Sequence, residues 1–241
     1  KGLNPNAPMR DSGVEWLGEV PEHWEFTRLG WITTEINDIN HEMPTAVEEG
    51  VPFLSAKDLL NDGTLNFTHD IKKISEYDFA KLSAKICPRR NDIVYSRIGA
   101  ALGKARLVEN DIRFLVSYSC CVIRVIESRA NPLYISLFLD TDLALTEAKS
   151  RTVGIGVPDL GLKEIARFPI PLPPKCEQVL IEHYLLEKTA KFTNLLENCQ
   201  EGVKLLQERR TAIISAAVTG KIDVRNWRVP VASNNNKEVN P

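Results

Sequence analysis

The sequence predicts a mixed α/β domain over residues 1–174, then one long α-helix over residues 175–220 and a polar tail over residues 221–241. The first observation is that short runs rich in Val, Ile and Tyr alternate with short helical patterns as far as residue 172, which is typical of interleaved strands and helices. The second is a cluster of three prolines before residue 175, because proline is not tolerated in a helix interior. The third is that residues 176–218 contain no proline and a single glycine, Gly202.

Strands and helices can be placed in chain order within the first domain. Ser75 is a good N-cap ahead of a short apolar run, and Asn131-Pro132 puts a proline in the first turn of another helix. Runs of β-branched and aromatic residues favour strands, and the short, irregularly spaced helices argue against a doubly wound parallel sheet. The expected elements are helical turns at 28–36, a strand at 51–56, a turn at Asp62-Gly63, a helix from Ser75 through Leu82, strands at 92–97 and 114–126, a helix from Asn131 through Leu139, and a strand at 168–172.

The long helix is expected to project beyond its own domain. At 1.5 Å per residue it is roughly 65 Å long, whereas a compact domain of the preceding residues is only about 40 Å across. Its apolar residues recur in steps of three, four and seven and form one stripe, which Lys188 and Arg210 interrupt. A helix lying wholly on its own core is the alternative, but the length favours a coiled coil with a partner helix. The expected interface is Ile181, Leu185, Phe192, Leu195, Cys199, Val203, Leu206, Ile213 and Ala217.

Composition limits the class of protein. Five cysteines without a Cys-x-x-Cys pair favour a reducing, cytoplasmic setting over disulfides or a zinc site. No apolar run has the length of a membrane span, and the first residues lack the apolar core of a signal peptide. Neither a catalytic triad nor a phosphate-binding lysine loop can be argued from spacing. The sequence therefore predicts no catalytic residue, metal site, cofactor or membrane partner.

Charge is distributed unevenly, although the net charge is only −2. Residues 11–50 carry ten acidic groups against Arg28 alone, whereas residues 79–106 carry seven basic groups against Asp92 alone. A solvated surface is the plain interpretation of such a run. The alternative is a set of contacts to DNA phosphates, with arginines that could also read guanine edges. The candidate DNA-binding residues are Lys81, Lys85, Arg89, Arg90, Arg97, Lys104 and Arg106.

Two sequence blocks resemble a known family. The first runs from Asp11 to Trp24 and holds two tryptophans around Pro21. The second is Pro-Leu-Pro-Pro at 171–174 with Glu177-Gln178, followed by Leu-Gln-Glu-Arg-Arg-Thr-Ala-Ile-Ile at 206–214 and Ala-Val-Thr-Gly-Lys-Ile-Asp-Val-Arg at 217–225. Together they are similar to the opening of a target-recognition half and to the helical spacer in the specificity subunits of type I restriction–modification enzymes.

The resemblance implies a non-catalytic subunit that reads half of a bipartite DNA site. The subunit would dock methyltransferase subunits, which carry the chemistry and S-adenosylmethionine, and ATP-driven restriction subunits, while the spacer helix sets the distance between two recognition domains. Residues 1–5 resemble the junction between two tandem halves, since Gly220-Lys221-Ile222-Asp223 has a similar pattern. We therefore expect a second half whose helix, lacking its partner, associates with a second copy in an antiparallel pair near Cys199.

Two rival functions remain open at the level of sequence. Asn131-Pro132-Leu133-Tyr134 resembles the Asn-Pro-Pro-Tyr motif of DNA adenine methyltransferases, but Gly154-Ile155-Gly156 lies downstream of it and lacks the third glycine of a cofactor loop. We interpret Asn131 as a helix start and Gly154–Gly156 as a flexible loop. A coiled-coil adaptor that binds no DNA is the second rival. Neither the bases recognised nor the spacing between half-sites can be deduced from the sequence.

Overall fold

A computed structural model of the chain describes residues 2, 4–68, 70–152, 156–225 and 228. These residues fall into two compact units, unit 1 over Lys1–Leu185 and unit 2 over Leu186–Pro241. Gly154 and Ile155 of the expected loop, and most of the predicted tail, lie outside the described residues. Within the described ranges, no helix is both long enough and apolar enough to cross a membrane.

A four-stranded antiparallel sheet forms the centre of unit 1, in the order β4, β10, β7, β8. Val94 pairs with Val122 and Tyr95 pairs with Cys121, so the register of β7 and β10 is fixed in the middle of the sheet. All residues of β7 are buried, which explains its continuous apolar pattern. The strands are β4 (Thr33–Asn37), β7 (Asp92–Ser96), β8 (Ala105–Leu107) and β10 (Cys120–Val125).

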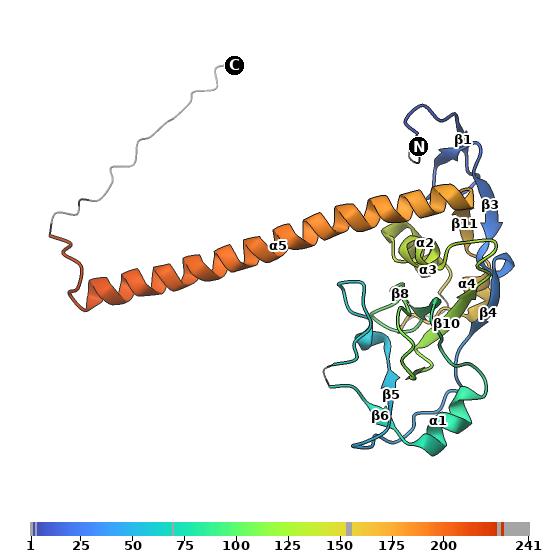
Figure 1. The fold of residues 1–241 in the computed structure, drawn as a ribbon, viewed down its shortest axis with the longest axis horizontal. Coiled ribbons are helices and arrows are strands. Elements are labelled where there is room, and N and C mark those ends of the chain that lie inside the picture. Colours follow the sequence, from blue (N-terminus) through green and yellow to red (C-terminus); the bar gives the residue numbers. More distant parts are fainter. Residues whose placement is uncertain (1, 3, 69, 153–155, 226–227, 229–241) are drawn as a thin grey trace. The chain divides into compact units, whose positions relative to one another are not determined.

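The central sheet separates two hydrophobic cores. Successive side chains of a strand point to opposite faces, so Ile93 and Tyr95 of β7 enter one core and Val94 enters the other. The first core is closed by α2 (Pro132–Leu139), α3 (Asp142–Ser150), α4 (Leu162–Ala166) and β11 (Pro169–Leu172). The second is closed by β5 (Val51–Leu54), β6 (Lys73–Ile74), β9 (Leu115–Val116) and α1 (Glu76–Ser83). Figure 1 shows α1, β5 and β6 together at one end of unit 1.

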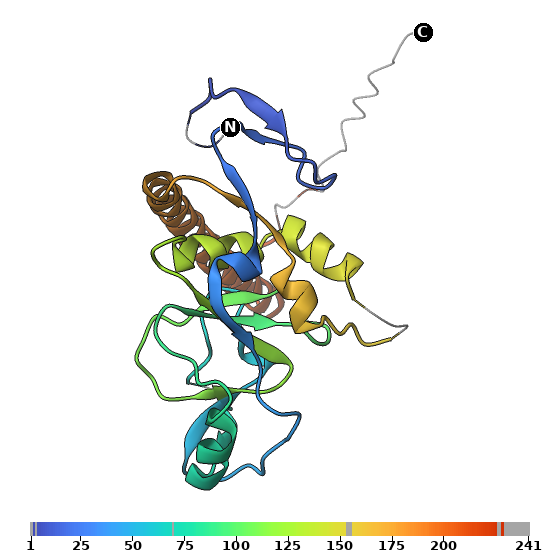
Figure 2. The same cartoon turned by 90° about the vertical axis from the view of Figure 1, so that its right-hand side faces the viewer.

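The opposite end of unit 1 holds the first sequence block. Here β1 (Met9–Asp11) pairs with β2 (Glu19–Pro21), and β3 (Glu25–Arg28) pairs with β11. Figures 1 and 2 both place this hairpin away from α1. The Trp16 indole donates to Glu147 of α3 at 2.7 Å, and the Trp24 indole donates to Glu177 at 3.2 Å. The two tryptophans therefore attach the block to unit 1 through buried or half-buried carboxylates.

Most predicted elements are confirmed, with two corrections. The helical turns expected at 28–36 are wrong: the segment is the end of β3, a short 3₁₀ turn η1 (Leu29–Trp31) and β4. Leu29 and Ile32 are buried three residues apart, which suits one 3₁₀ turn as well as an α-helix. The strand expected at 114–126 is two strands, β9 and β10, separated by a turn. A second 3₁₀ turn, η2 (Ala56–Asp58), begins directly after Ser55, the residue that follows β5.

The long helix predicted from Lys175 is confirmed as α5 (Lys175–Val218). Gly220 adopts a φ of +73° just beyond it, the left-handed conformation that commonly ends a helix. The start of α5 belongs to unit 1, because Gln178 is buried and its side chain bridges the backbones of Pro173 and Asn131. The boundary between the two units therefore falls within α5 rather than at its start.

Candidate nucleic-acid interface

The predicted basic residues do not form one patch, because they are divided between the two ends of β7. Arg89 and Arg90 precede Asp92, the first residue of the strand, whereas Arg97 follows its last residue, Ser96. At about 3.3 Å per residue, the Arg90 and Arg97 backbones are roughly 20 Å apart. Lys104 lies on the same side as Arg97, since Ser96 N donates to the Lys104 carbonyl at 2.9 Å.

Two of the predicted arginines are buried and hydrogen-bonded within their own domain. Arg97 is 4% exposed and Arg106 is 3% exposed. Arg106 donates to Asp140 Oδ1 and to the Leu60 carbonyl, both at 2.7 Å. Neither guanidinium can reach a phosphate without leaving these partners, and a buried charge left unpaired is costly. The local charge pattern therefore predicts a surface role for Arg97 and Arg106, whereas the structure buries both side chains.

The three predicted lysines have internal partners at the surface. Lys81 lies 2.5 Å from Glu42, and Lys85 lies 2.8 Å from Asp38 Oδ1. Lys104 donates to Asn61 Oδ1 at 2.8 Å. The Lys81–Glu42 pair is exposed and therefore weak, whereas the partner of Lys85 is the buried Asp38 carboxylate. Lys81 can therefore exchange its partner for a phosphate at a lower cost than Lys85 can.

Arg89 and Arg90 are exposed in the loop that enters β7. The Arg89 amide donates to Asp92 Oδ2 at 2.9 Å, and Asp92 in turn accepts from Arg124. This buried carboxylate fixes the loop backbone while the two guanidiniums remain in solvent. Phosphate contact by Arg89 and Arg90 remains a prediction.

A pocket of about 650 Å³ opens where the loops meet beyond the last residue of β7. Leu160 N donates to the Arg97 carbonyl at 3.0 Å, Gly99 N donates to the Pro158 carbonyl at 3.0 Å, and Arg97 N donates to the Ser119 carbonyl at 2.9 Å. Three loops that are distant in sequence are therefore joined through backbone hydrogen bonds. The pocket is lined by Asp38, His41, Arg97, Asp159, Gly161, Leu162, Lys163 and Glu164.

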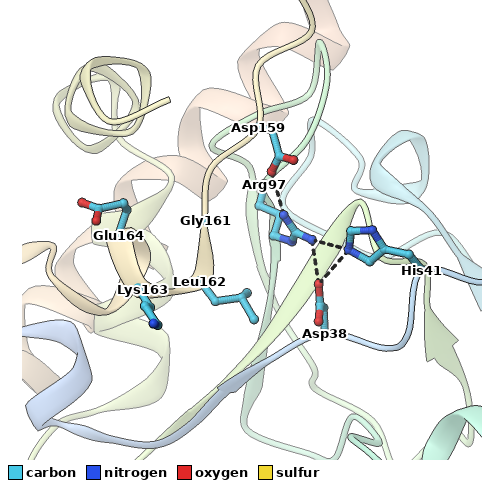
Figure 3. A pocket seen from close by; sticks show the side chains of 8 residues that line it. All are labelled: Asp38, His41, Arg97, Asp159, Gly161, Leu162, Lys163 and Glu164. Carbon is cyan, nitrogen blue, oxygen red and sulfur yellow. Dashed lines mark hydrogen bonds and ion pairs between the residues drawn. The ribbon is translucent and has the colours of Figure 1, made fainter. Parts of the chain in front are cut away.

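The Arg97 guanidinium is the centre of this pocket (Figure 3). Its Nη1 donates to Asp159 Oδ1 at 2.8 Å, and its Nη2 donates to Asp38 Oδ2 at 2.6 Å. The same Nη2 lies 3.1 Å from His41 Nε2, and the His41 ring stacks on Tyr118 with centroids 4.7 Å apart. One arginine thus holds a residue from each side of the pocket in a fixed position.

Asp38 remains ionised because its cationic partners outweigh its burial. Burial by itself would raise the pKa of this carboxyl group, but hydrogen bonds from Lys85 and Arg97 hold the pKa below its ordinary value. Sequence reasoning missed Asp38, His41 and Asp159 as a group. They have no common spacing, and Asp38 and Asp159 lie 59 and 62 positions from Arg97 in the chain.

The structure assigns Asn131 a role in capping a helix. Its side-chain oxygen accepts from Leu133 N at 2.9 Å and its amide donates to Glu182 at 2.6 Å. This is the geometry of an N-cap, so the predicted helix start is confirmed. In the described part of the chain, no group of three or more His, Cys, Asp or Glu side chains is arranged to hold a metal ion.

Most of the predicted helix interface is exposed within α5. Phe192, Leu195, Val203, Leu206 and Ile213 are each more than half exposed, and Cys199 is exposed as well. Ile181 differs from them, since it is half-buried against the first core of unit 1. Leu185 and Ala217 are half-buried.

A protein-family profile matches most of the chain. The profile described as the type I restriction modification DNA specificity domain matches residues 21–205. A curated relative is the type I restriction enzyme EcoKI specificity subunit of Escherichia coli K12, which is 23% identical over 220 residues and is matched across 88% of this chain and 46% of its own length. Another is the MjaVIII specificity subunit of Methanocaldococcus jannaschii, 27% identical over 208 residues, with 83% of this chain and 43% of that relative covered.

Solved structures share the fold. A chain from a study of complex assembly and conformational transition of the type I R-M system matches with a TM-score of 0.61 and 19% identity, over 87% of this chain and 48% of that chain. The HsdS subunit from Thermoanaerobacter tengcongensis gives a TM-score of 0.54 and 20% identity, over 78% of this chain and 48% of its own. The chain spans about half the length of the relatives that it matches.

Proposed function

Because the chain belongs to the type I restriction modification DNA specificity domain family, we propose that it is a DNA-binding recognition half of a specificity subunit. The observation that carries this proposal is the match over residues 21–205, which includes the central sheet, both cores and most of α5. Relatives that bear the name of specificity subunits support it. The chain reads one half of a bipartite site, since it spans about half of each of those relatives.

The proposed role is non-catalytic. The chain recognises double-stranded DNA in the cytoplasm and docks methyltransferase subunits, which supply S-adenosylmethionine and the chemistry, and restriction subunits. Capping by Asn131 supports this role against the methyltransferase alternative, because the Asn131 side chain is engaged by α2 and Glu182.

Binding affinity comes from phosphate contacts by the exposed cations. Arg89 and Arg90 supply the strongest of these contacts, because their guanidiniums lie in solvent on a fixed loop. Lys81 and Lys104 contribute after exchanging their present partners, and Lys85 contributes from its place beside Asp38. Each neutralised phosphate releases counterions, so the affinity falls steeply with salt.

The helix α5 joins the chain to a second copy when no other half is present. Large apolar side chains on its stripe are exposed, and burying each of them is worth about 1.5–3 kcal/mol. Several such contacts exceed an association cost of roughly 4–15 kcal/mol. An antiparallel two-fold pair would place Cys199 near the axis.

Two assays on the purified chain test this function against its rivals. A labelled duplex titrated with the chain at low salt separates a DNA-binding subunit from a coiled-coil adaptor, which would leave the duplex free. Incubation with S-adenosylmethionine and duplex separates it from a methyltransferase fragment, because the proposed subunit transfers no methyl group. Methyl transfer by the chain alone, or the absence of any duplex binding, contradicts the proposal.

A further inference from the structure

The pocket around Arg97 is a built site rather than a gap between loops. Its polar groups come from the segment after β4, the end of β7 and the segment before α4, and hydrogen bonds join all three. Leu162, the first residue of α4, points into the pocket and adds an apolar wall (Figure 3). Arg97 is buried, whereas the side chains of His41 and Asp159 are 62% and 54% exposed. Besides Lys163 and Glu164 of α4, the pocket therefore offers two accessible polar groups that rest on a buried support.

The hydrogen-bond roles of these two groups follow from Arg97. A guanidinium only donates and does not lose its proton in proteins, so His41 Nε2 must accept in the 3.1 Å contact with Nη2. The proton of the neutral imidazole is then on Nδ1, which makes no hydrogen bond within the described part of the chain. Asp159 Oδ1 accepts from Nη1, and its second oxygen is left to accept from a ligand.

We propose that this pocket reads the edge of a base pair in the DNA major groove, with His41 and Asp159 as reading groups and Arg97 as their positioning residue. The inference rests on the proposed function. A carboxylate accepts from the N4 amine of cytosine or the N6 amine of adenine, and an imidazole N–H donates to a purine N7. Both groups contact one guanidinium, which fixes the position of one relative to the other. Leu162 supplies a surface for a thymine methyl group.

Arg97 contributes by geometry rather than by charge at the interface. Its fork holds Asp38, His41 and Asp159 at once, and lysine has no planar fork with which to replace it. A positioning role and a phosphate contact give different salt dependence. Loss of a phosphate contact reduces the slope of log affinity against log salt by about 0.9, whereas loss of a positioning residue leaves that slope unchanged.

The test selects duplexes from a library with a randomised central segment, using the full chain. Parent, His41→Phe, Asp159→Asn and Arg97→Lys proteins each select a pool that is sequenced. His41→Phe keeps a ring against Tyr118 while removing both nitrogens, and Asp142→Asn changes an exposed aspartate of α3 as a control. Melting curves check that each variant is folded. Because His41 and Asp159 are exposed, their variants keep the test valid if Arg97→Lys is unstable.

The parent and Asp142→Asn are expected to select one common motif. Asp159→Asn should move one position of that motif from cytosine toward adenine, because an amide pairs with adenine N6 and N7. His41→Phe should lower the preference for a purine at an adjacent position by roughly ten-fold. Arg97→Lys should relax both positions together without changing the salt slope.

Three outcomes overturn the inference in distinguishable ways. If the pocket variants select the parent motif unchanged, the bases are read elsewhere while the proposed function stands. If Arg97→Lys reduces the slope of log affinity against log salt by about 0.9, the value for one lost phosphate contact, Arg97 touches a phosphate and is not a positioning residue. If the parent selects no motif, the proposed function fails and this inference fails with it.

Discussion

Arg97 shows how far a residue's role depends on partners that are remote in sequence. A run of basic residues from Lys81 to Arg106 predicts a charged surface, but the prediction counts only neighbours in the chain. Asp38 and Asp159 fold against Arg97 from 59 and 62 positions away and remove its charge from solvent. Arg89 has no such partner for its guanidinium in the described residues, and its surface placement follows from the sequence directly.

The ion pair between Arg97 and Asp38 predicts a pH-dependent stability. Asp38→Asn should lower the free energy of unfolding at pH 7 by about 3 kcal/mol, because it removes the buried one of the two carboxylates that pair with the Arg97 guanidinium. Since the folded-state pKa of Asp38 is lowered, its contribution is present above the unfolded-state value of about 4 and is lost as pH falls through the folded value.

Urea unfolding of the parent and of Asp38→Asn between pH 7 and pH 3 measures this dependence. The difference between the two should shrink below about pH 4, where the carboxyl group of the unfolded parent becomes protonated while the folded-state pKa lies lower. Asp142→Asn, on an exposed helical position, should match the parent at every pH. A difference that stays constant with pH would show that the carboxylate charge is not what stabilises this pair.

Arg89 and Arg90 carry the prediction for phosphate contacts. Replacing both with alanine should weaken duplex binding and reduce the slope of log affinity against log salt by about 2, or 0.9 for each lost contact. Lys221→Ala with Arg225→Ala removes the same charge from exposed positions after α5 and should leave the slope unchanged. Fluorescence anisotropy at several salt concentrations gives both slopes. Equal slopes for the Arg89/Arg90 variant and the parent would place the phosphate contacts elsewhere.

At the scale of elements, the sequence predicts where helices and buried strands lie better than it predicts which strands pair with one another. The signals for α1, α2 and α5 are local, because capping residues and proline positions lie within each element. The order β4, β10, β7, β8 has no local signal, since a fully buried strand is apolar on both faces. The segment after Arg28 was misassigned because its buried pair, Leu29 and Ile32, fits more than one kind of helical turn.

Two glycines in unlike surroundings predict opposite effects. Gly202 lies in the interior of α5, and a Cβ there would meet no atom within 4 Å, so Gly202→Ala should stabilise the helix by about 1 kcal/mol. Gly103 has a φ of +92°, and its Cβ would lie 2.6 Å from Leu145 Cδ1, so Gly103→Ala should destabilise unit 1. Thermal unfolding followed by circular dichroism measures both changes. A stabilised Gly103→Ala or a destabilised Gly202→Ala would contradict the respective placement.

The exposed apolar stripe on α5 predicts that the chain self-associates. The same helix also offers a matched control pair of leucines. Leu195→Asp with Leu206→Asp places two charges on the stripe, whereas Leu186→Asp with Leu205→Asp places them on other faces of the same helix. All four leucines are exposed, so the pairs differ chiefly in the face they occupy. Sedimentation at micromolar concentration should find a dimeric parent, a monomeric stripe variant and a dimeric control. A monomeric parent, or loss of the dimer in both variants, would mean that the stripe does not form the interface.

For the whole molecule, each of the two sequence blocks that resemble the family corresponds to a defined structural feature. The first block is held by its tryptophans against Glu147 and Glu177, and the second contains α5 and its glycine stop. The candidate reading pocket has no comparable motif. It depends on three loops that are distant in sequence and meet at one end of β7 in the central sheet.

Competition binding tests most directly whether this chain reads a DNA sequence. A labelled duplex carrying the motif selected by the parent is competed with the same duplex unlabelled and with a scrambled duplex of equal length and composition. Both should show a steep dependence on salt, because both present the same phosphates. The selected duplex should compete at least a hundred-fold better at the highest salt that still permits binding, where base contacts decide affinity. Equal competition by the two duplexes would contradict sequence recognition by this chain.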